Sequence, residues 1–178
     1  NLLTEPYAAF DFVGKNTDNG YSVWASNVIY NETMKKYVMY FCTTSSYVKS
    51  TLCFATADNI EGPYTYVDTI LYSGYGKSNI SETNLYDVLG KNADISRYLD
   101  YGGYNNKEWP NCIDPAIFTD ADGRMWMNYG SWSGGIFLLE IDPTTGYPIY
   151  PVDDKDADPY YGYRLIGGGH HSAEGPYI

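Results

Sequence analysis

A β-meander is encoded in WPNCIDPAIFTDADGRMWMNYGSWSGGIFLLEID, residues 109–142. A short apolar run follows Asp114, the turn residues Asp-Ala-Asp-Gly stand at 120–123, and two further runs of alternating apolar and polar residues come after them. Short alternating runs separated by turn residues are typical of antiparallel strands joined by hairpins. We therefore expect a meander with the carboxyl group of Asp114 at the head of its first strand.

The preceding part of the chain follows the same plan. β-type runs separated by turn-forming residues are predicted at 23–30, 36–44, 51–57 and 64–72. Residues 37–41 align with 125–129, and after a shorter hairpin 54–58 align with 138–142. Chance similarity of two meanders is the alternative, but the shared Asp-x-x-x-Gly spacing favours a true repeat. Repeated four-stranded units predict an all-β fold, a partial β-propeller with about two four-stranded blades plus the start of a third.

The 178 residues are expected to belong to a single propeller domain. Its predicted segments are a leading segment at 1–22, a blade at 23–72, an insertion at 73–111, a blade at 112–170 and the start of the next blade at 171–178. The leading segment has room for one short strand near 8–13. The insertion has room for short helices at 81–90 and 94–99, the first with Ser81 as its N-cap.

Two blades and part of a third cannot close a propeller ring. An open propeller would leave apolar sheet faces and an unpaired strand edge in water. We therefore expect the remaining blades of the same propeller to be supplied by a longer polypeptide than these 178 residues.

The composition is rich in aromatic residues, with 21 Tyr and 4 Trp against 6 Phe. Such side chains suit the interior of β-sheets and also stack on flat ligands such as sugars, and ordinary packing is expected to account for most of them. The formal charge of −11, without any basic cluster, argues against nucleic acid and against an anionic membrane as partners. No apolar run reaches the roughly 18 residues that a membrane-spanning helix needs.

Three cysteines are present, so at least one lacks a disulfide partner within the chain. If residues 45–50 form a hairpin turn, Cys42 lies directly opposite Cys53, where a cross-strand disulfide is geometrically feasible. The alternative is a pair of reduced, buried thiols, which we favour because free cysteines are common core residues. Cys112 lies close to Asp114 but has no His or metal ligand paired with it.

Two carboxylates, Asp114 and Glu174, are candidates for catalysis. Asp114 heads a predicted inner strand, although an Asp-Pro pair is equally a strand-initiating turn. Glu174 belongs to a Glu-Gly-Pro-Tyr tetrapeptide that also occurs at 61–64, in a predicted outer turn where the Glu would be solvated and idle. Acids at the heads of successive inner strands would face one pocket, and opposing carboxylates are what glycoside hydrolysis requires.

His170 and His171 are adjacent, so in a strand they would point to opposite sides and could not hold one metal ion together. With no Cys or carboxylate at ligand spacing, a zinc site is not expected. The sequence also lacks a phosphate-binding loop, a serine nucleophile elbow and a dinucleotide fingerprint. No metal ion or cofactor is therefore predicted for this chain by itself.

Three motifs occur in order along the chain. They are Cys-Ile-Asp-Pro-Ala-Ile-Phe-Thr-Asp-Ala-Asp-Gly at 112–123, Tyr-Gly-Ser-Trp-Ser-Gly-Gly-Ile at 129–136 with Leu-Leu-Glu-Ile-Asp at 138–142, and Ala-Glu-Gly-Pro-Tyr at 173–177. In this order they resemble the five-bladed propeller glycosidases of glycoside hydrolase family 43, most closely the arabinanase-like members. Val-Trp-Ala-Ser-Asn-Val-Ile at 23–29 is similar to that family's Trp-Ala-Pro-Asp segment, with Ser26 and Asn27 in place of Pro and Asp.

This resemblance implies an inverting hydrolase with three acidic residues. On the matching positions, Glu174 would be the general acid and Asp114 the pKa modulator that also orients it. The family's general base is an Asp upstream of the Trp-Ala segment, and no residue of this chain matches it, because Asp11 and Asp18 lie too close to Trp24. The chain by itself is therefore expected to be inactive.

The side chains expected to bind substrate stand at strand heads or in loops on the same face of the propeller, where each could equally serve packing. They are Trp24, Asn111, Ser131 and Trp132. Relatives in the family often hold calcium near the propeller axis through a His of a later blade. Calcium is therefore an expectation for a complete domain, through a residue that this chain does not contain.

The resemblance implies a secreted, extracellular arabinan endo-1,5-α-L-arabinanase-like enzyme that cleaves α-L-arabinofuranosyl linkages in a polysaccharide or oligosaccharide. Two alternatives remain. A β-xylosidase or α-L-arabinofuranosidase of the same family would differ in loops such as 73–110. The second alternative is a non-catalytic carbohydrate-binding propeller, because the base is not in this chain.

Overall fold

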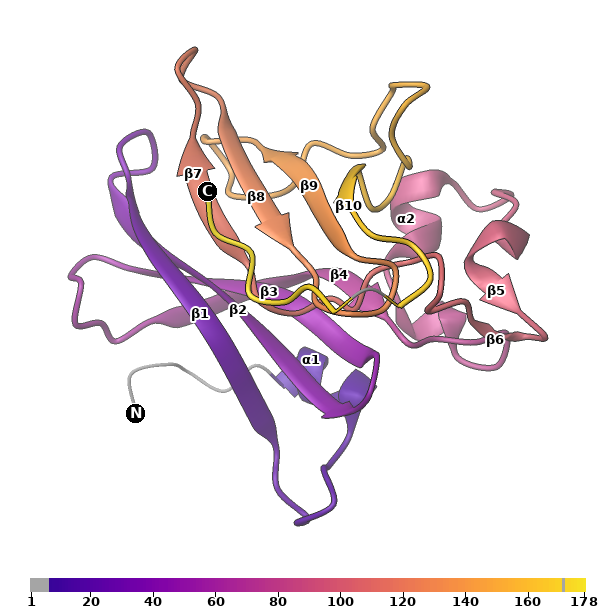
Figure 1. The fold of residues 1–178 in the computed structure, drawn as a ribbon. Coiled ribbons are helices and arrows are strands. Elements are labelled where there is room, and N and C mark those ends of the chain that lie inside the picture. Colours follow the sequence, from indigo (N-terminus) through magenta and orange to yellow (C-terminus); the bar gives the residue numbers. More distant parts are fainter. Residues whose placement is uncertain (1–6, 171) are drawn as a thin grey trace.

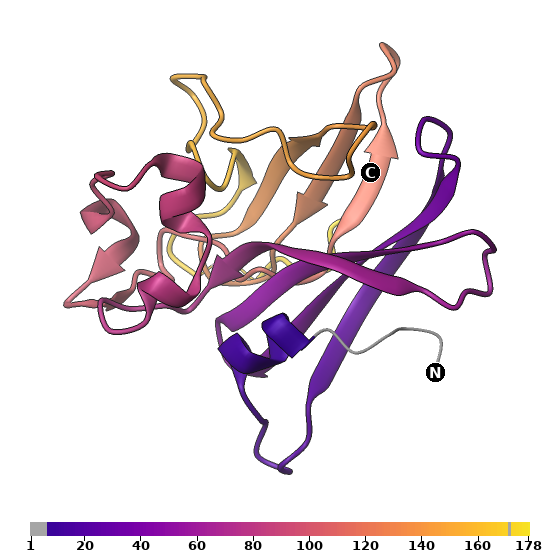
Figure 2. The same ribbon diagram turned by 180° about the vertical axis from the view of Figure 1, so that it is seen from behind.

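The computed structural model describes residues 7–170 and 172–178, and its main features are two four-stranded antiparallel sheets (Figures 1 and 2). The first sheet has the order β1 (Ser22–Asn31), β2 (Lys36–Ser46), β3 (Lys49–Ala57) and β4 (Thr65–Ser73). The second has the order β7 (Ala116–Thr119), β8 (Met125–Tyr129), β9 (Ile136–Ile141) and β10 (Tyr163–Ile166). Both are meanders of consecutive strands, which confirms the two predicted propeller blades.

The main hydrophobic core lies between the two sheets. Alternate residues of β2, among them Val38 and Tyr40, face this core together with Met127 and Tyr129 of β8, and all four are fully buried. The alternation follows from the two-residue period of a strand, which puts every second side chain on one face. At the inner edge β1 contacts β7, and the Asn27 side-chain oxygen accepts a hydrogen bond of 3.1 Å from the Ile117 N–H.

The tyrosines serve mainly as core residues, as the sequence predicted. Six of the largest fully buried side chains are tyrosines: Tyr40, Tyr75, Tyr98, Tyr129, Tyr160 and Tyr161. Their polar ends are satisfied internally, since the Tyr98 hydroxyl lies 3.1 Å from both carboxylate oxygens of buried Asp158. Burial raises the pKa of the Asp158 carboxyl, and Arg97 lies 3.5 Å from it. This network fastens the insertion to the second blade.

The insertion after β4 contains short helical turns and a small ladder. They are the 3₁₀ turn η1 (Ile80–Glu82), α2 (Leu85–Leu89), the 3₁₀ turn η2 (Ser96–Tyr98), β5 (Leu99–Asp100) and β6 (Gly103–Tyr104). The predicted N-cap at Ser81 is wrong, because Ser81 lies inside η1 and α2 begins only after Asn84. The buried Thr83 hydroxyl instead bonds the Ile80 carbonyl at 2.7 Å, which ends the first turn and separates it from α2.

The strand expected near 8–13 is wrong, because this segment is the helix α1 (Tyr7–Val13). Ala9, Phe12 and Val13 are buried, and this spacing places them on one face of a helix, whereas a strand would divide them between two faces. The helix packs on β2, β3 and β4 of the first sheet (Figure 2). Tertiary burial of a short apolar stripe therefore decided the local conformation.

The cysteine pairing considered from the sequence is also wrong in register. Cys42 pairs with Leu52, and Cys53 pairs with Phe41, so the two cysteines lie on opposite faces of the sheet. The cause is a β-bulge between Thr44 and Ser46, which shifts the register by one residue next to a tighter turn. All three cysteines are free and buried, as favoured above, and burial raises the pKa of the Cys42 thiol to about 12.

Residues 172–178 form no strand, although they were predicted to start the next blade. They run along the second sheet and end beside β7 (Figure 1). A strand requires a hydrogen-bonded neighbour, and the described residues of this segment have none in a ladder. Over residues 7–170 and 172–178, no helix combines the length and the apolarity that a membrane crossing would need.

Candidate active site

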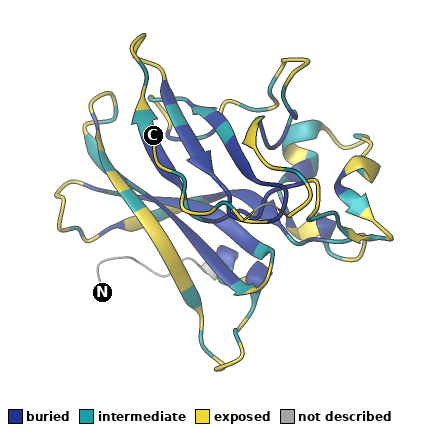
Figure 3. Cartoon of the chain, viewed as in Figure 1, coloured by how far each residue is buried: buried dark blue, intermediate teal, exposed yellow. Residues whose placement is uncertain are grey.

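Figure 3 shows how burial is distributed over the sheets, with the middle strands β2, β3, β8 and β9 largely dark blue and most of β1 exposed. β1 and β7 are the edge strands of their sheets and lie side by side. The predicted site residues stand on β1, in the turn before β7, in the loop after β8 and in the segment after residue 172.

Asp114 stands two residues before β7 in a left-handed backbone conformation, with φ of 54°. Two hydrogen bonds hold the turn around it, from the Ile113 N–H to the Asn111 carbonyl at 2.9 Å and from the Gly130 N–H to the Ile113 carbonyl at 2.9 Å. Asp adopts this region more readily than most residues, and conformations of this kind persist where the surroundings enforce them. The turn is thus fixed from both sides.

Ser131 connects the two predicted acids. Its side-chain hydroxyl donates a hydrogen bond to Oδ2 of Asp114, and Oγ of Ser131 accepts one of 3.0 Å from the Gly175 N–H. Ser131 is only 1% exposed, so both partners contact it inside the protein. One hydroxyl therefore joins the head of β7 to the residue that follows Glu174.

Trp132 makes two contacts to the segment that carries the second acid. Its backbone N–H donates to the Ala173 carbonyl at 2.7 Å, and its indole Nε1–H donates to Oε2 of Glu174 at 3.1 Å. Trp132 and Ser133 both have left-handed φ values, 53° and 46°. Consecutive left-handed non-glycine residues are uncommon and mark a strained loop of the kind found at functional sites.

Asp114 and Glu174 line one cavity of about 350 Å³, which we call the carboxylate cavity. Its other lining residues are Ala25, Ser26, Asn27, Pro115, Ala116, Gly175, Pro176 and Tyr177. They come from β1, from the head of β7 and from the segment after residue 172. The structure therefore brings together the two carboxylates that the sequence singled out, in a hollow open to solvent.

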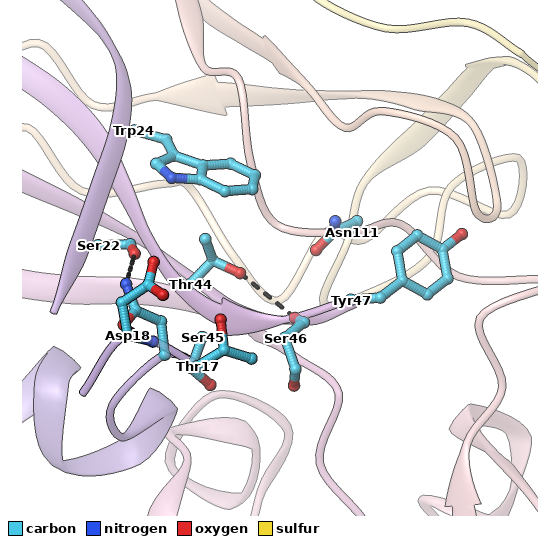
Figure 4. Close-up of a pocket in the computed structure, with 10 residues that line it drawn as sticks. Thr17, Asp18, Ser22, Trp24, Thr44, Ser45, Ser46, Tyr47 and Asn111 are labelled. Carbon is cyan, nitrogen blue, oxygen red and sulfur yellow. Dashed lines mark hydrogen bonds between the residues drawn. The ribbon is translucent and has the colours of Figure 1, made fainter. Parts of the chain in front are cut away.

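Trp24 and Asn111 lie in a second cavity of about 450 Å³, which we call the aromatic cavity (Figure 4). Trp24 and Tyr47 are 54% and 58% exposed and lie on opposite sides of it, whereas Asn111 is almost buried between them. A β-bulge between Trp24 and Ser26 interrupts the pairing of β1 at this point. Bulges re-aim side chains, so Trp24 lines one cavity while the next residue, Ala25, lines the other.

Tyr47 was missed by the sequence reasoning. It lies at the tip of the β2–β3 hairpin, and its hydroxyl is 3.0 Å from Oγ of Ser133 and 3.3 Å from Nδ1 of His170. The hairpin tip of the first blade thus contacts both the strained loop and the segment that leads to Glu174. A large aromatic residue among serines in a turn was the signal available in the sequence, but it did not identify the contacts.

The remaining titratable candidates lie elsewhere. Asp18 lines the aromatic cavity and Asp11 lies in α1, so neither reaches the carboxylate cavity. His171 lies outside the described residues. Within the described part of the chain, no group of three or more His, Cys, Asp or Glu side chains could hold a metal ion. Calcium stays an expectation for a complete domain.

Comparison with known proteins places these motifs in a family, although no family model matches the chain. An extracellular endo-α-(1→5)-L-arabinanase from Thermotoga petrophila is 38% identical over 156 residues, which cover 88% of this chain and 28% of that protein. An extracellular endo-α-(1→5)-L-arabinanase 2 from Bacillus subtilis is 34% identical over 178 residues, 100% of this chain and 31% of that protein. The chain thus spans about three tenths of the length of these curated relatives.

Solved structures agree with the sequence relatives. A family 43 glycoside hydrolase from Bacillus licheniformis, YxiA, superposes with a TM-score of 0.68 at 32% identity, over 93% of this chain and 31% of that one. The endo-1,5-α-L-arabinanase of Thermotoga petrophila superposes with a TM-score of 0.64 at 33% identity, over 91% of this chain and 30% of that one. Together with the two blades and the order of the three motifs, these similarities establish that the chain belongs to glycoside hydrolase family 43.

Proposed function

We propose that the protein carrying this chain hydrolyses the α-1,5-linked L-arabinofuranosyl units of arabinan with inversion, and that Glu174 is its general acid. The observation that carries the proposal is the carboxylate cavity, in which Asp114 and Glu174 are joined by the loop at 131–132. Glycoside hydrolysis requires an acid and a base, and the cavity supplies the acid, Glu174, together with Asp114 as the carboxylate that orients it. The names of the relatives support arabinan as the substrate and an extracellular location.

The hydrogen bond from Trp132 assigns the two oxygens of Glu174 different tasks. Because the indole N–H donates to Oε2, that oxygen acts as an acceptor, and the transferable proton of the acid form belongs on Oε1. Oε1 gives this proton to the glycosidic oxygen while the bond from that oxygen to the anomeric carbon breaks, and the bonding electrons remain on the oxygen. The leaving sugar departs as a neutral alcohol.

Water attacks the anomeric carbon from the opposite face as the leaving sugar departs. Its proton passes to a general base, a carboxylate that lies outside this chain, and the new bond gives the inverted configuration. Inverting glycosidases hold the acid and the base roughly 6.5–9.5 Å apart, which leaves room for this water. Asp114 orients the acid from the adjacent strand head through Ser131.

The aromatic cavity supports a sugar as the ligand. Trp24 and Tyr47 offer aromatic faces, and the rest of the lining consists mainly of hydroxyl and amide groups, with no Lys or Arg among the residues that line it. Such a surface suits stacking and hydrogen bonding to an uncharged sugar. Because the bulge puts Ala25 in the neighbouring cavity, one arabinan chain could contact both cavities.

The test uses the full-length protein with linear arabinan as substrate. Nuclear magnetic resonance of the first products should show anomeric inversion, and Glu174→Ala should lower turnover about 10²–10⁴-fold while substrate binding is largely kept. Unchanged turnover in Glu174→Ala would contradict the assignment of the acid. Binding without turnover in the unaltered protein would instead support a carbohydrate-binding propeller, and release from xylosides or from arabinose side chains alone would support the other family activities.

A further inference from the structure

Ser131 occupies an unusual position between the two acids. Its Oγ donates to Oδ2 of Asp114 and accepts from the Gly175 N–H at 3.0 Å. A serine hydroxyl has one proton to donate, and the proton of Ser131 is already directed at the carboxylate. Since the residue is 1% exposed, no surface of it is open to a sugar.

We infer that Ser131 is a positioning residue, which sets the placement of Glu174 relative to Asp114 and does not itself contact substrate. This inference rests on the proposed function, because it assigns a role within the same site. Ser131 was expected from the sequence to bind substrate. The geometry gives its only hydroxyl to two protein groups, one on each acid-bearing segment.

The loop that carries Ser131 is suited to act as a template. Three backbone hydrogen bonds join this loop to the segment that carries Glu174. The carbonyls of Gly134 and Ser133 accept from the N–H groups of Gly168 (3.0 Å) and His170 (3.1 Å). The N–H of Trp132 donates to the Ala173 carbonyl at 2.7 Å. The segment is therefore fastened to the loop both before and after the position of Glu174.

The loop also has little room to move. A Cβ atom at Gly135 would collide with the Ile166 carbonyl, and one at Gly134 would collide with the Glu108 carbonyl, so backbone approaches the loop closely on two sides. Because close-packed protein is hardly compressible, a displacement of this loop would also displace the segment bonded to it. A small displacement of a catalytic group can cost up to about 10²-fold in rate, so the Ser131 bond is placed where it affects catalysis without touching substrate.

The experiment compares two substrates in the full-length protein carrying Ser131→Ala. Linear arabinan needs its leaving oxygen protonated, whereas a dinitrophenyl arabino-oligosaccharide has a leaving group that departs without an acid. We expect kcat on arabinan to fall about 10- to 100-fold with KM nearly unchanged, and the rate on the dinitrophenyl substrate to stay within about threefold. This selective loss would support positioning of the acid.

A loss that appears in KM, or equally on both substrates, would identify Ser131 as a substrate contact or a merely structural residue and would overturn the inference. Unchanged rates on both substrates would overturn it as well. Thr51→Val is the matched control, because Thr51 is fully buried and its hydroxyl bonds Thr43 at 2.6 Å, away from both acids. It should leave the ratio of the two rates unchanged.

Folding and the underlying proposal are checked separately. If Ser131→Ala unfolds in a thermal melt, Ser131→Cys replaces the hydroxyl by a weakly donating thiol of similar shape and undergoes the same comparison. Glu174→Gln is measured beside it. An active Glu174→Gln protein would reject the proposed function, whereas an inactive Glu174→Gln with a fully active Ser131→Ala would reject only the positioning role.

Discussion

The tetrapeptide Glu-Gly-Pro-Tyr occurs twice in this chain, and the two copies contact different parts of the molecule. At 61–64 it lies in the turn between β3 and β4, where Glu61 is exposed and Tyr64 is buried at 4% exposure. At 174–177 the glutamate is exposed as well, but Glu174 lines the carboxylate cavity and its Oε2 accepts a hydrogen bond from the Trp132 indole, while Tyr177 is 83% exposed.

The backbone of the two copies is similar at one point, since Gly62 and Gly175 both have left-handed φ values, 81° and 60°. The difference lies in what faces them. Gly62 N–H bonds the Asn59 carbonyl of its own turn at 2.9 Å, whereas Gly175 N–H bonds Ser131 of a distant loop. The same short sequence therefore stabilises a turn in one place and presents an acid in the other.

The largest expected difference concerns the two glutamates. Glu174→Gln should lower kcat on linear arabinan about 10²–10⁴-fold, because the amide cannot donate the acidic proton, and should leave the melting temperature nearly unchanged. Glu61→Gln should change neither quantity, because its side chain is in solvent. Steady-state kinetics and a thermal melt of both full-length variants measure this, and a comparable rate loss in Glu61→Gln would remove the contrast.

The next effect reverses the roles of the two copies. Tyr64→Ala should lower the free energy of unfolding by about 3 kcal/mol, because it removes a buried ring and the 2.8 Å bond from the Tyr64 hydroxyl to the Ile60 carbonyl. Denaturant titration measures the loss. At a temperature where the variant is folded, kcat on arabinan should equal that of the unaltered protein, and a tenfold fall would show that the first copy also serves catalysis.

A smaller effect is expected from the partner of the second copy. Trp132→Phe keeps an aromatic ring but loses the indole N–H that bonds Oε2 of Glu174, so kcat on arabinan should fall about tenfold. The change should be selective for arabinan over an activated aryl substrate. If instead KM rises and kcat is kept, the ring acts by binding sugar and its bond to Glu174 is incidental.

The smallest effect concerns the glycine of the first copy. Gly62→Ala should cost about 1 kcal/mol of stability, because an alanine is disfavoured at φ of 81°. It should leave kcat unchanged. Gly175→Ala, measured beside it, should lower both stability and kcat on arabinan. The Gly175 N–H bonds Ser131, so a shift of the backbone at residue 175 would also move Glu174. Identical kinetic behaviour of the two variants would contradict a special role for the second glycine.

The strands and the two acids were within reach of sequence reasoning because their signals are local. Alternating runs and turn residues predicted both sheets. Asp114 and Glu174 were expected to face one pocket from successive strand heads, and both line the carboxylate cavity although Glu174 stands on no strand. The helix α1 was not predictable in this way, because burial against the first sheet selects its conformation. The opposite faces of Cys42 and Cys53 depend on one bulge, which has no strong sequence signal.

For the site residues, too, the sequence indicated the chemical type but not the contacts. The chemical type of Trp24, Asn111, Ser131 and Trp132 suggested that they belong to the site, but which of them touch each other depends on contacts between distant segments. Ser131 and Glu174 are connected through a hydroxyl and a backbone N–H that no pattern in the sequence specifies. The same holds for Tyr47, whose partners lie in the second blade.

The central claim is that Glu174 donates a proton to the leaving sugar. It is tested most directly by the ratio of kcat/KM for linear arabinan to kcat/KM for a dinitrophenyl arabino-oligosaccharide in the full-length Glu174→Gln protein. We predict that this ratio falls at least about 10²-fold, because only arabinan needs the proton. An equal loss on both substrates would contradict the assignment, since a group that acts as a general acid cannot matter equally to a leaving group that needs none.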